Sequence, residues 1–334
     1  MKQRVTFSII ITNHNYARFV GAAIDSALAL DWPDIEVIVV DDGSTDGSRE
    51  IIAGYGGRVT ALFVANGGQL SASNAGFAAA TGDVVIFLDA DDLLEPEIAR
   101  EIAAVWHPGV SKVQVQMRRV DADNRPLGSV IPNITRAPSP RQIRALAASG
   151  AGYPSPPGSG NAYARTYLSR LFPLVRRLDR APDSQCIAKA PFFGDVVTIV
   201  KPLVRYRIHG ANVSIPRHED SFFGHECTRA LARLEFAREA SAAQGGDAPP
   251  YEGLFRNLHL IQLRMASLKL QPACHPLKGD GLGRVMFDAL AAPFRAGFEP
   301  SGLRVMITGW TLLTALSPKS IARRLIYYRF RIDR

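Results

Sequence analysis

The chain has 334 residues, of which 47% are hydrophobic and 21% charged, and this composition excludes wholesale disorder. The formal net charge of +8 suits an anionic ligand or an anionic membrane surface. Aromatic and basic residues are not interleaved in the way that binders of single-stranded nucleic acid show, so we do not expect nucleic acid as a partner. The three cysteines are widely spaced, so we expect reduced thiols and neither a disulfide framework nor a zinc site.

Strand and helix signals alternate along the first hundred residues. Continuous apolar runs predict four buried strands at residues 7–11, 35–40, 59–64 and 84–88. Helices are predicted between these strands. Because such runs indicate burial on both faces, we predict an α/β fold with a mostly parallel, Rossmann-like sheet sandwiched by helices. The run 7–11 is too short for the core of a signal peptide, and no run reaches the roughly 18 apolar residues of a membrane span, so we expect a cytoplasmic protein.

The rest of the chain divides into a mixed part and a helical part. The pattern predicts a helix from residue 96 to about 106, strands over 111–120 and 195–208, and a loop rich in Pro, Gly and Ser over 132–160 with a short helix near 141–148. From about residue 219 the pattern is helical, with breaks at 245–250 and 271–283. We place a domain boundary near residue 215, which separates 1–215 from a helical C-terminal extension, 216–334.

Polar side chains directly follow three of the predicted strands. In open parallel sheets, ligands bind beyond the carboxyl ends of the strands. If the sheet is parallel, all three clusters lie on one edge and can face one ligand. The clusters are Thr12-Asn13-His14-Asn15, Asp41-Asp42-Gly43-Ser44-Thr45-Asp46 and Asp89-Ala90-Asp91-Asp92.

The third cluster concentrates negative charge after a buried strand. Adjacent carboxylates repel one another, so the group is costly unless a cation is bound or protons are shared. Hard divalent cations favour carboxylate oxygens, and Mg²⁺ or Mn²⁺ commonly bridges carboxylate to phosphate. A helix cap with acidic first-turn residues would explain one such cluster. A second acidic cluster at 41–46, on the same edge, favours a metal and phosphate site, where Asp41 or Asp42 could accept a hydrogen bond from a base or ribose.

These motifs resemble, in order and spacing, the signature of family 2 glycosyltransferases with the GT-A fold. The resemblance spans roughly residues 5–215 and includes Asn74-Ala75-Gly76 and, more weakly, the segment 206–214. It implies inverting transfer of a sugar from a nucleoside diphosphate sugar, expected to be a UDP-sugar, with Mn²⁺ or Mg²⁺ as cofactor. The implied acceptor is a hydroxyl of a glycan or lipid-linked molecule, as in cell-surface polysaccharide synthesis. Residues 1–110 would bind the donor, and 111–215 would form the acceptor side.

The resemblance also implies roles for individual residues. Donor-binding roles would fall to Thr12, His14, Asn15, Asp41, Asp42, Asn74 and Asp89. Asp91, Asp92 and His209 would be metal ligands. His14 and Ser73 stand where relatives more often have tyrosine and arginine, so the identity of the donor is not carried over.

The catalytic base is expected to be a carboxylate about 20–30 residues before the segment 206–214. Asp183 is our choice, and Asp179 and Asp195 are rivals. Asp183 would at the same time suit the N-cap of a helix from Ser184 to Ala188. The stretch 150–160 would be either an acceptor-side lid or an ordinary surface loop.

Two rival functions and one further partner remain open. A sugar nucleotidyltransferase would normally show a Gly-rich basic loop after the first strand, where this chain has Thr12-Asn13-His14-Asn15. A non-catalytic sugar-nucleotide-binding module would bind the donor without turnover. In the tail, the apolar run 303–316 and the six Lys/Arg of 317–334 suit peripheral contact with an anionic membrane surface, or a basic helix packed on the catalytic domain.

Overall fold

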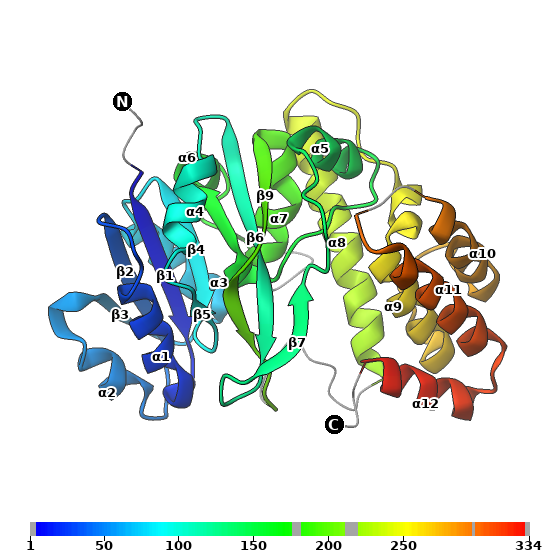
Figure 1. Ribbon diagram of the computed structural model, residues 1–334, viewed down its shortest axis with the longest axis horizontal. Helices are drawn as coiled ribbons and strands as arrows, with labels where there is room; N and C mark the ends of the chain where they lie inside the picture. The colour runs from blue at the N-terminus through cyan, green and yellow to red at the C-terminus, as the bar shows by residue number, and fades with distance from the viewer. Residues whose placement is uncertain (1–4, 176–181, 211–219, 296–297, 331–334) are drawn as a thin grey trace. The chain divides into compact units, whose positions relative to one another are not determined.

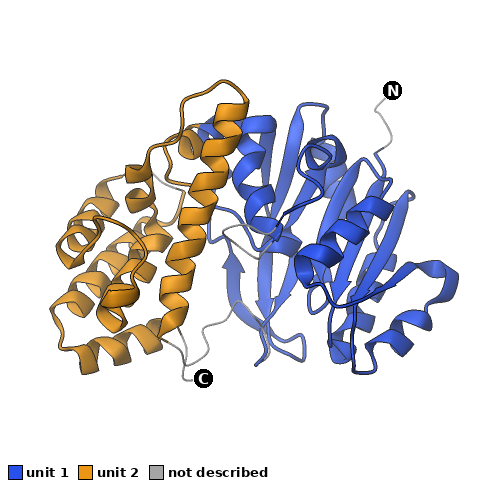
Figure 2. Cartoon of the chain, turned by 180° about the vertical axis from the view of Figure 1, so that it is seen from behind, with its two compact units in different colours: residues 1–144, 154–210 blue, residues 145–153, 211–334 orange. Residues whose placement is uncertain are grey.

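The computed structural model describes residues 5–175, 182–210, 220–295 and 298–330 (Figure 1). The chain forms two compact units, shown in different colours in Figure 2. Unit 1 comprises residues 1–144 and 154–210, and unit 2 comprises 145–153 and 211–334. The predicted boundary near residue 215 lies outside the described residues. Among the described residues, no helix combines the length and the apolar character needed to cross a membrane.

Unit 1 is an α/β structure, as predicted. Its strands are β1 (Phe7–Asn13), β2 (Ile35–Asp42), β3 (Thr60–Val64), β4 (Val84–Asp89), β5 (Leu93–Leu94), β6 (Val110–Val120), β7 (Pro126–Ile131), β8 (Asn161–Ala164) and β9 (Asp195–Arg207). Its helices are α1 (Ala17–Leu28), α2 (Ser48–Ala53), α3 (Gln69–Ala79), α4 (Ile98–Val105), α6 (Arg165–Leu168) and α7 (Pro182–Phe193), and α5 (Pro140–Ala148) crosses into unit 2.

The strands form one sheet in the order β3-β2-β1-β4-β8-β6-β9-β5, with β7 paired to β6. β1 is parallel to β2 and to β4, and β2 is parallel to β3. β8 is antiparallel to both β4 and β6, so β6 and its parallel neighbour β9 run in the same direction as β4. The carboxyl ends of β1, β2, β4, β6 and β9 therefore lie along one edge of the sheet.

Helices cover both faces of the parallel part of the sheet, which explains its unbroken apolar strands. On one face, Ile9 and Ile11 of β1 share a core with Val20 and Ile24 of α1. On the other face α3 lies so close that a Cβ on Gly76 would stand 2.4 Å from the Cγ2 of Ile10. A side chain at residue 76 would push α3 off the sheet.

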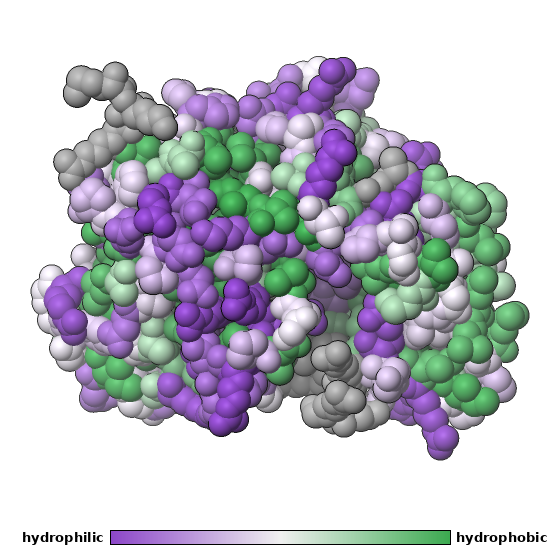
Figure 3. Space-filling view, in the orientation of Figure 1, coloured by the Kyte–Doolittle hydropathy of each residue, from purple (hydrophilic) through white to green (hydrophobic). Residues whose placement is uncertain are grey.

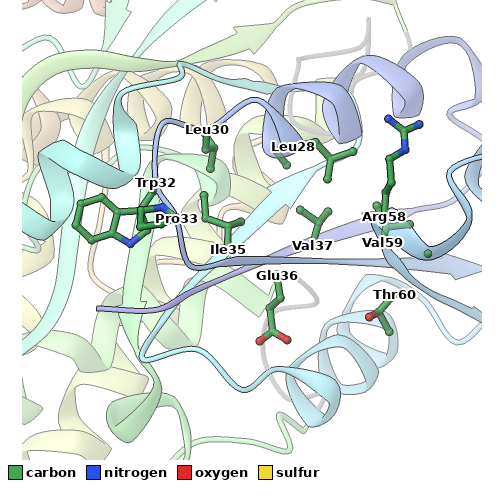
Figure 4. Close-up of a pocket in the computed structure, with 12 residues that line it drawn as sticks. Leu28, Leu30, Trp32, Pro33, Ile35, Glu36, Val37, Arg58, Val59 and Thr60 are labelled. Atoms are coloured by element: carbon green, nitrogen blue, oxygen red, sulfur yellow. The ribbon is translucent and has the colours of Figure 1, made fainter. Parts of the chain in front are cut away.

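A hollow of about 370 Å³ lies near the amino ends of β2 and β3 (Figure 4). Leu28, Trp32, Ile35 and Arg58 are among the residues that line it. Because the polar clusters follow the carboxyl ends of the same strands, this hollow is separate from them.

Unit 2 is helical, as predicted for the C-terminal part. Its elements are α8 (Ser221–Ala243), the 3-10 turn η3 (Tyr251–Arg256), α9 (Leu258–Leu270), η4 (Pro272–Cys274), α10 (Leu282–Ala291), η5 (Ala292–Phe294), α11 (Ser301–Leu316) and α12 (Lys319–Phe330). At its centre the buried Arg264 binds Asp280 at 2.7 Å and Asp288 at 2.9 Å. Burial raises the pKa of Asp280, but hydrogen bonds from Arg264 and His275 outweigh it and lower that pKa to about 2.

Candidate active site

The three polar clusters meet at one edge of the sheet, because β1 pairs in parallel with both of its neighbours. Asn13 at the end of β1 lies opposite Asp41 of β2, and Thr12 lies opposite Asp89 of β4. The register therefore brings the motifs after β1, β2 and β4 side by side at the carboxyl edge.

The acidic turn after β4 gathers three carboxylates. Oxygen atoms of Asp89, Asp91 and Asp92 lie within 4.8 Å of one another. The Asp92 carboxylate is fixed at both oxygens, since Ser159 Oγ donates to Oδ2 at 2.7 Å and the backbone N–H of Arg207 donates to Oδ1 at 3.0 Å. The Gln69 amide donates to Asp89 Oδ1 at 3.0 Å. Asp89 and Asp92 are thus held by residues from α3, from β9 and from the turn before β8.

The electrostatics of this cluster favour a bound cation. Burial, followed by the charges of Asp91 and Asp183, raises the pKa of Asp89 to about 7. Burial, followed by the charges of Asp91 and Asp89, raises the pKa of Asp92 well above its ordinary value. The hydrogen bonds that both carboxylates accept lower their pKa values, but burial and the neighbouring charges outweigh this effect. A divalent cation would remove this repulsion, and clustered carboxylate oxygens are the donor set that Mg²⁺ and Mn²⁺ prefer.

His209 and Arg207 approach the acidic turn from the carboxyl end of β9. His209 Nε2 lies 2.9 Å from Asp91 Oδ2, and its ring packs against Phe19 with centroids 4.6 Å apart. Arg207 Nε donates to the carbonyl oxygen of Asp91 at 2.7 Å. His209 is therefore placed either to share a cation with Asp91 or to orient the Asp91 carboxylate. Residues 211–214 of the predicted motif lie outside the described residues.

The loops after β1 and β2 present an exposed imidazole beside a bound carboxylate. His14 Nδ1 lies 2.8 Å from the carbonyl oxygen of Asp42. The two oxygens of the Asp42 carboxylate accept the backbone N–H groups of Gly67 and Gly68, both at 2.8 Å. A carboxylate oxygen can accept more than one hydrogen bond, so Asp42 still has capacity for a ligand.

Asp41 and Asn15 mainly hold these loops in shape. The buried Asp41 accepts from Asn13 Nδ2 at 2.9 Å and from the backbone N–H of Ser44 at 3.1 Å. Asn15, which has a positive φ of 60°, accepts the backbone N–H of Thr45 at 2.8 Å. Gly43 has φ +68°, and a Cβ there would stand 2.7 Å from the backbone nitrogen of Asn66, so the turn requires glycine.

Of the predicted donor-binding residues Thr12 and Asn74, Thr12 lies at the carboxyl edge of the sheet, and Asn74 binds the backbone of a neighbouring segment. Thr12 is half-buried at the carboxyl edge, opposite Asp89. The Asn74 side chain donates to the carbonyl oxygen of Leu174 at 2.9 Å and accepts its N–H at 2.7 Å. The structure thus uses the Asn74 amide to hold the segment after α6, and its donor-binding role stays a prediction.

Of the three candidate bases, Asp183 faces the acidic cluster. A Cβ built on Gly158 would lie 3.7 Å from Asp89 Oδ2 and 4.0 Å from the Cβ of Asp183, so both acids lie close to Gly158. Asp183 lies in the first turn of α7, which begins at Pro182, and not at the predicted N-cap. Asp195 lies at the amino end of β9, on the opposite edge of the sheet, where it binds Arg144 at 2.8 Å. Asp179 lies outside the described residues.

Sequence reasoning missed Ser159. This serine is fully buried, donates to Asp92 and accepts the backbone N–H of Asp89 at 3.1 Å, so it is not part of a surface loop. The turn that carries it is anchored by the buried Lys112, whose Nζ donates to Ser155 at 2.9 Å and to Asn161 at 2.8 Å. No pattern in residues 154–160 distinguishes Ser159 from Ser155, because its role depends on an acid 67 positions earlier in the chain.

The raised pKa of Asp89 predicts a pH-dependent response to metal. In metal-free protein this carboxyl binds more protons in the folded than in the unfolded state between its ordinary pKa of 3.8 and about 7. Its contribution to stability therefore falls as pH rises through that window. A cation binds the deprotonated form. We expect Mn²⁺ to raise the melting temperature more at about pH 8 than at about pH 5.

Differential scanning fluorimetry with and without EDTA checks this expectation. Asp89→Asn is the control, because it removes one of the two acids with a raised pKa and should reduce the difference between the two pH values. An Mn²⁺ effect that is equal at both pH values in the wild type would contradict the assignment of a shared cation site.

Residues 8–172 match the family described as Glycosyl transferase family 2. Over 213 residues the chain is 39% identical to an uncharacterized glycosyltransferase of Nostoc sp. strain PCC 7120, which covers 61% of this chain and 65% of the relative. The chain thus spans less than two thirds of that relative's length.

Two solved structures have a similar fold. S. aureus TarS 1–349 in complex with UDP-GlcNAc has a TM-score of 0.52 at 16% identity, covering 96% of this chain and 92% of that one. A mannosyltransferase from Pyrobaculum calidifontis in complex with GDP-Man and Mn²⁺ has a TM-score of 0.53 at 20% identity, covering 97% and 85%. These likenesses confirm the predicted GT-A fold.

Proposed function

Since residues 8–172 place this chain in glycosyl transferase family 2, we propose that it transfers a sugar from a nucleoside diphosphate sugar to an acceptor hydroxyl. One observation carries the proposal: Asp89, Asp91 and Asp92 gather at the sheet edge where His14 and Asp42 are also presented. The complexes of TarS with UDP-GlcNAc and of the mannosyltransferase with GDP-Man support a nucleotide sugar as donor.

The donor would lie along the edge from β2 to β4. We assign the base to the exposed His14 imidazole and the Asp42 carboxylate, and the ribose or sugar to Asp89, with Thr12 and Asn15 supporting the pocket. A UDP-sugar is the expected donor, since Asp42 can accept the N3–H of uracil. Asp91, Asp92 and His209 would hold a Mn²⁺ or Mg²⁺ ion, which when bound neutralises charge on the departing diphosphate.

Asp183 is the proposed catalytic base. It lies beside Gly158, as Asp89 does, and its charge contributes to the raised pKa of Asp89, so it is near enough to the cluster to act on an acceptor hydroxyl there. Proton removal by a positioned carboxylate makes the neutral hydroxyl a competent nucleophile. Attack by this hydroxyl would invert the anomeric carbon in a single displacement. A glycan or lipid-linked acceptor, polysaccharide synthesis and a cytoplasmic location stay predictions.

The decisive experiment measures donor binding and turnover together. With Mn²⁺ present, the correct nucleotide sugar at about 100 times its Kd should raise the melting temperature by on the order of 5 °C, and EDTA should abolish the shift. Adding a hydroxyl acceptor should release nucleoside diphosphate. Consumption of a nucleoside triphosphate would instead indicate a nucleotidyltransferase. Binding without release of diphosphate, and insensitive to Asp183→Asn, would indicate a non-catalytic module.

A further inference from the structure

Helix α11 in unit 2 exposes the residues that a soluble helix normally buries. Val305, Leu313 and Leu316 are 61%, 56% and 77% exposed, while Thr311 and Thr314 of the same helix are fully buried. With the exposed Gly309 between them, these positions recur at the three- and four-residue spacing of one helical face. The charged residue of α11, Arg304, is turned toward the backbone, where its guanidinium donates to Arg295 and Glu299 carbonyl oxygens. Ile307 of this helix packs into the core of unit 2, so the apolar side chains on its other side are left facing outward.

The apolar surface continues onto the elements packed beside α11. Phe287, Leu290 and Phe294 follow the same spacing along α10 and η5 and are 69%, 50% and 90% exposed. α10 and α12 both contact α11. Figure 3 shows hydrophobic residues gathered over the part of unit 2 where Figure 1 draws α10 and α11. A contiguous apolar patch of this kind marks an interaction site in a folded protein. We call the exposed side chains of α10, η5 and α11 the apolar face.

Basic residues border this face. Residues 282–334 contain nine Lys or Arg and three acids, a net of +6. Of the two acids that the structure describes there, Asp288 is buried against Arg264 and Glu299 is only half-exposed. On α12, Lys319 and Arg324 are exposed, and Arg324 lies between Ile321 and Tyr328 on the same helical face. The surface therefore combines apolar and aromatic side chains with positive charge.

This combination selects an anionic lipid bilayer over a second copy of the chain. Two copies joined through the apolar face would bring two basic borders together, and like charges at short range repel. An anionic bilayer offers an apolar layer for Phe294 and Leu316 and phosphates for Lys319 and Arg324. Several apolar side chains and several basic residues together supply the two signals that stable peripheral binding requires.

We propose that the apolar face and the basic helix α12 dock this protein on an anionic lipid bilayer. Phe294 and Leu316 enter the boundary between headgroups and acyl chains, and Lys319 and Arg324 contact lipid phosphates. The sequence-based expectation of a membrane-binding tail is thereby extended to α10 and η5, which it did not include. Docking serves a lipid-linked acceptor only if the proposed transferase function holds, but the binding itself does not depend on it.

The test uses the full chain and vesicles of phosphatidylcholine with or without about 30% phosphatidylglycerol. We expect co-sedimentation with the anionic vesicles and at least a tenfold loss of partitioning in Phe294→Ser/Leu316→Ser. The matched control Leu127→Ser/Val175→Ser changes two apolar side chains of unit 1 that are 40% and 64% exposed, and should bind as the wild type does. Lys319→Glu/Arg324→Glu should bind weakly, and wild-type binding should fall between about 50 and about 500 mM salt.

Three outcomes would overturn the proposal. In the first, wild-type protein stays in the supernatant. In the second, Phe294→Ser/Leu316→Ser sediments as much as the wild type does. In the third, light scattering shows a wild-type dimer that this variant abolishes, and neither protein binds vesicles. Melting temperature and donor-induced shift are measured on the same samples without vesicles. Both should match the wild type, which excludes misfolding and separates a failure of docking from a failure of the transferase proposal.

Discussion

Asp91→Asn is expected to lower kcat/KM for sugar transfer by about 10³-fold or more, which corresponds to about 4 kcal/mol of transition-state stabilisation. Asp91 is the acid that His209 contacts, at 2.9 Å, and its charge raises the pKa of both Asp89 and Asp92. An amide in its place is a poor ligand for a divalent cation. Kinetics at saturating donor and a titration of Mn²⁺ measure the loss.

The same substitution distinguishes a metal ligand from a structural residue. Removing the Asp91 charge relieves repulsion within the cluster, so the metal-free variant should melt at or above the temperature of metal-free wild type. Mn²⁺ should stabilise the wild type and not the variant. The control is Asp31→Asn, an exposed acid paired with Arg100 in the loop before β2, which should leave activity and the Mn²⁺ response unchanged. An Asp91→Asn variant that loses stability as well as activity would point to a structural role.

The acidic edge could be predicted because it follows from topology. Once four buried runs are taken as parallel strands, the residues that end them must share one edge, and the register of β1 with β2 and β4 confirms this. The local turns add support, since Gly43 is required by its backbone conformation.

The residues that hydrogen-bond to the acids at this edge could not be predicted, because these bonds join segments that are distant in the sequence. Asp92 is bound by Ser159 and by the backbone of Arg207, which are 67 and 115 positions away. Two strands of the sheet were also not predicted. The strand β8 has only four residues, and β5 has only two. Periodicity needs longer segments than these to indicate a strand.

The alternating pattern of β6 correctly predicts a strand but not the burial of its polar side chains. Val113, Val115 and Met117 alternate as in a strand with one face in water. In the structure Lys112, Gln114 and Gln116 on the other face are also buried. Gln114 donates to Thr198 of β9 at 2.9 Å, and Lys112 donates to Asn161 of β8. Hydrogen bonds to neighbouring strands offset the cost of burying these polar groups, and hydropathy alone does not reveal such pairs.

The second large effect is expected for Asp183→Asn, which should lower kcat by about 10²–10⁴-fold. An amide cannot take the proton of the acceptor hydroxyl. The donor-induced shift in melting temperature should persist, because the proposed role of Asp183 is toward the acceptor and not toward the donor. Loss of one acid in the first turn of α7 should cost only about 0.3–1 kcal/mol of stability. Turnover and thermal shift, measured on the same preparation, test both statements.

Asp195→Asn is the matched control, because Asp195 is the rival base and lies on the opposite edge of the sheet with Arg144. It should keep most of its activity, and any loss should track loss of stability. An inactive Asp195→Asn beside an active Asp183→Asn would show that Asp183 is not the base. Loss of both donor binding and turnover in Asp183→Asn would instead move this residue to the donor side. If only turnover is lost, the result supports Asp183 as the base that takes the proton of the acceptor hydroxyl.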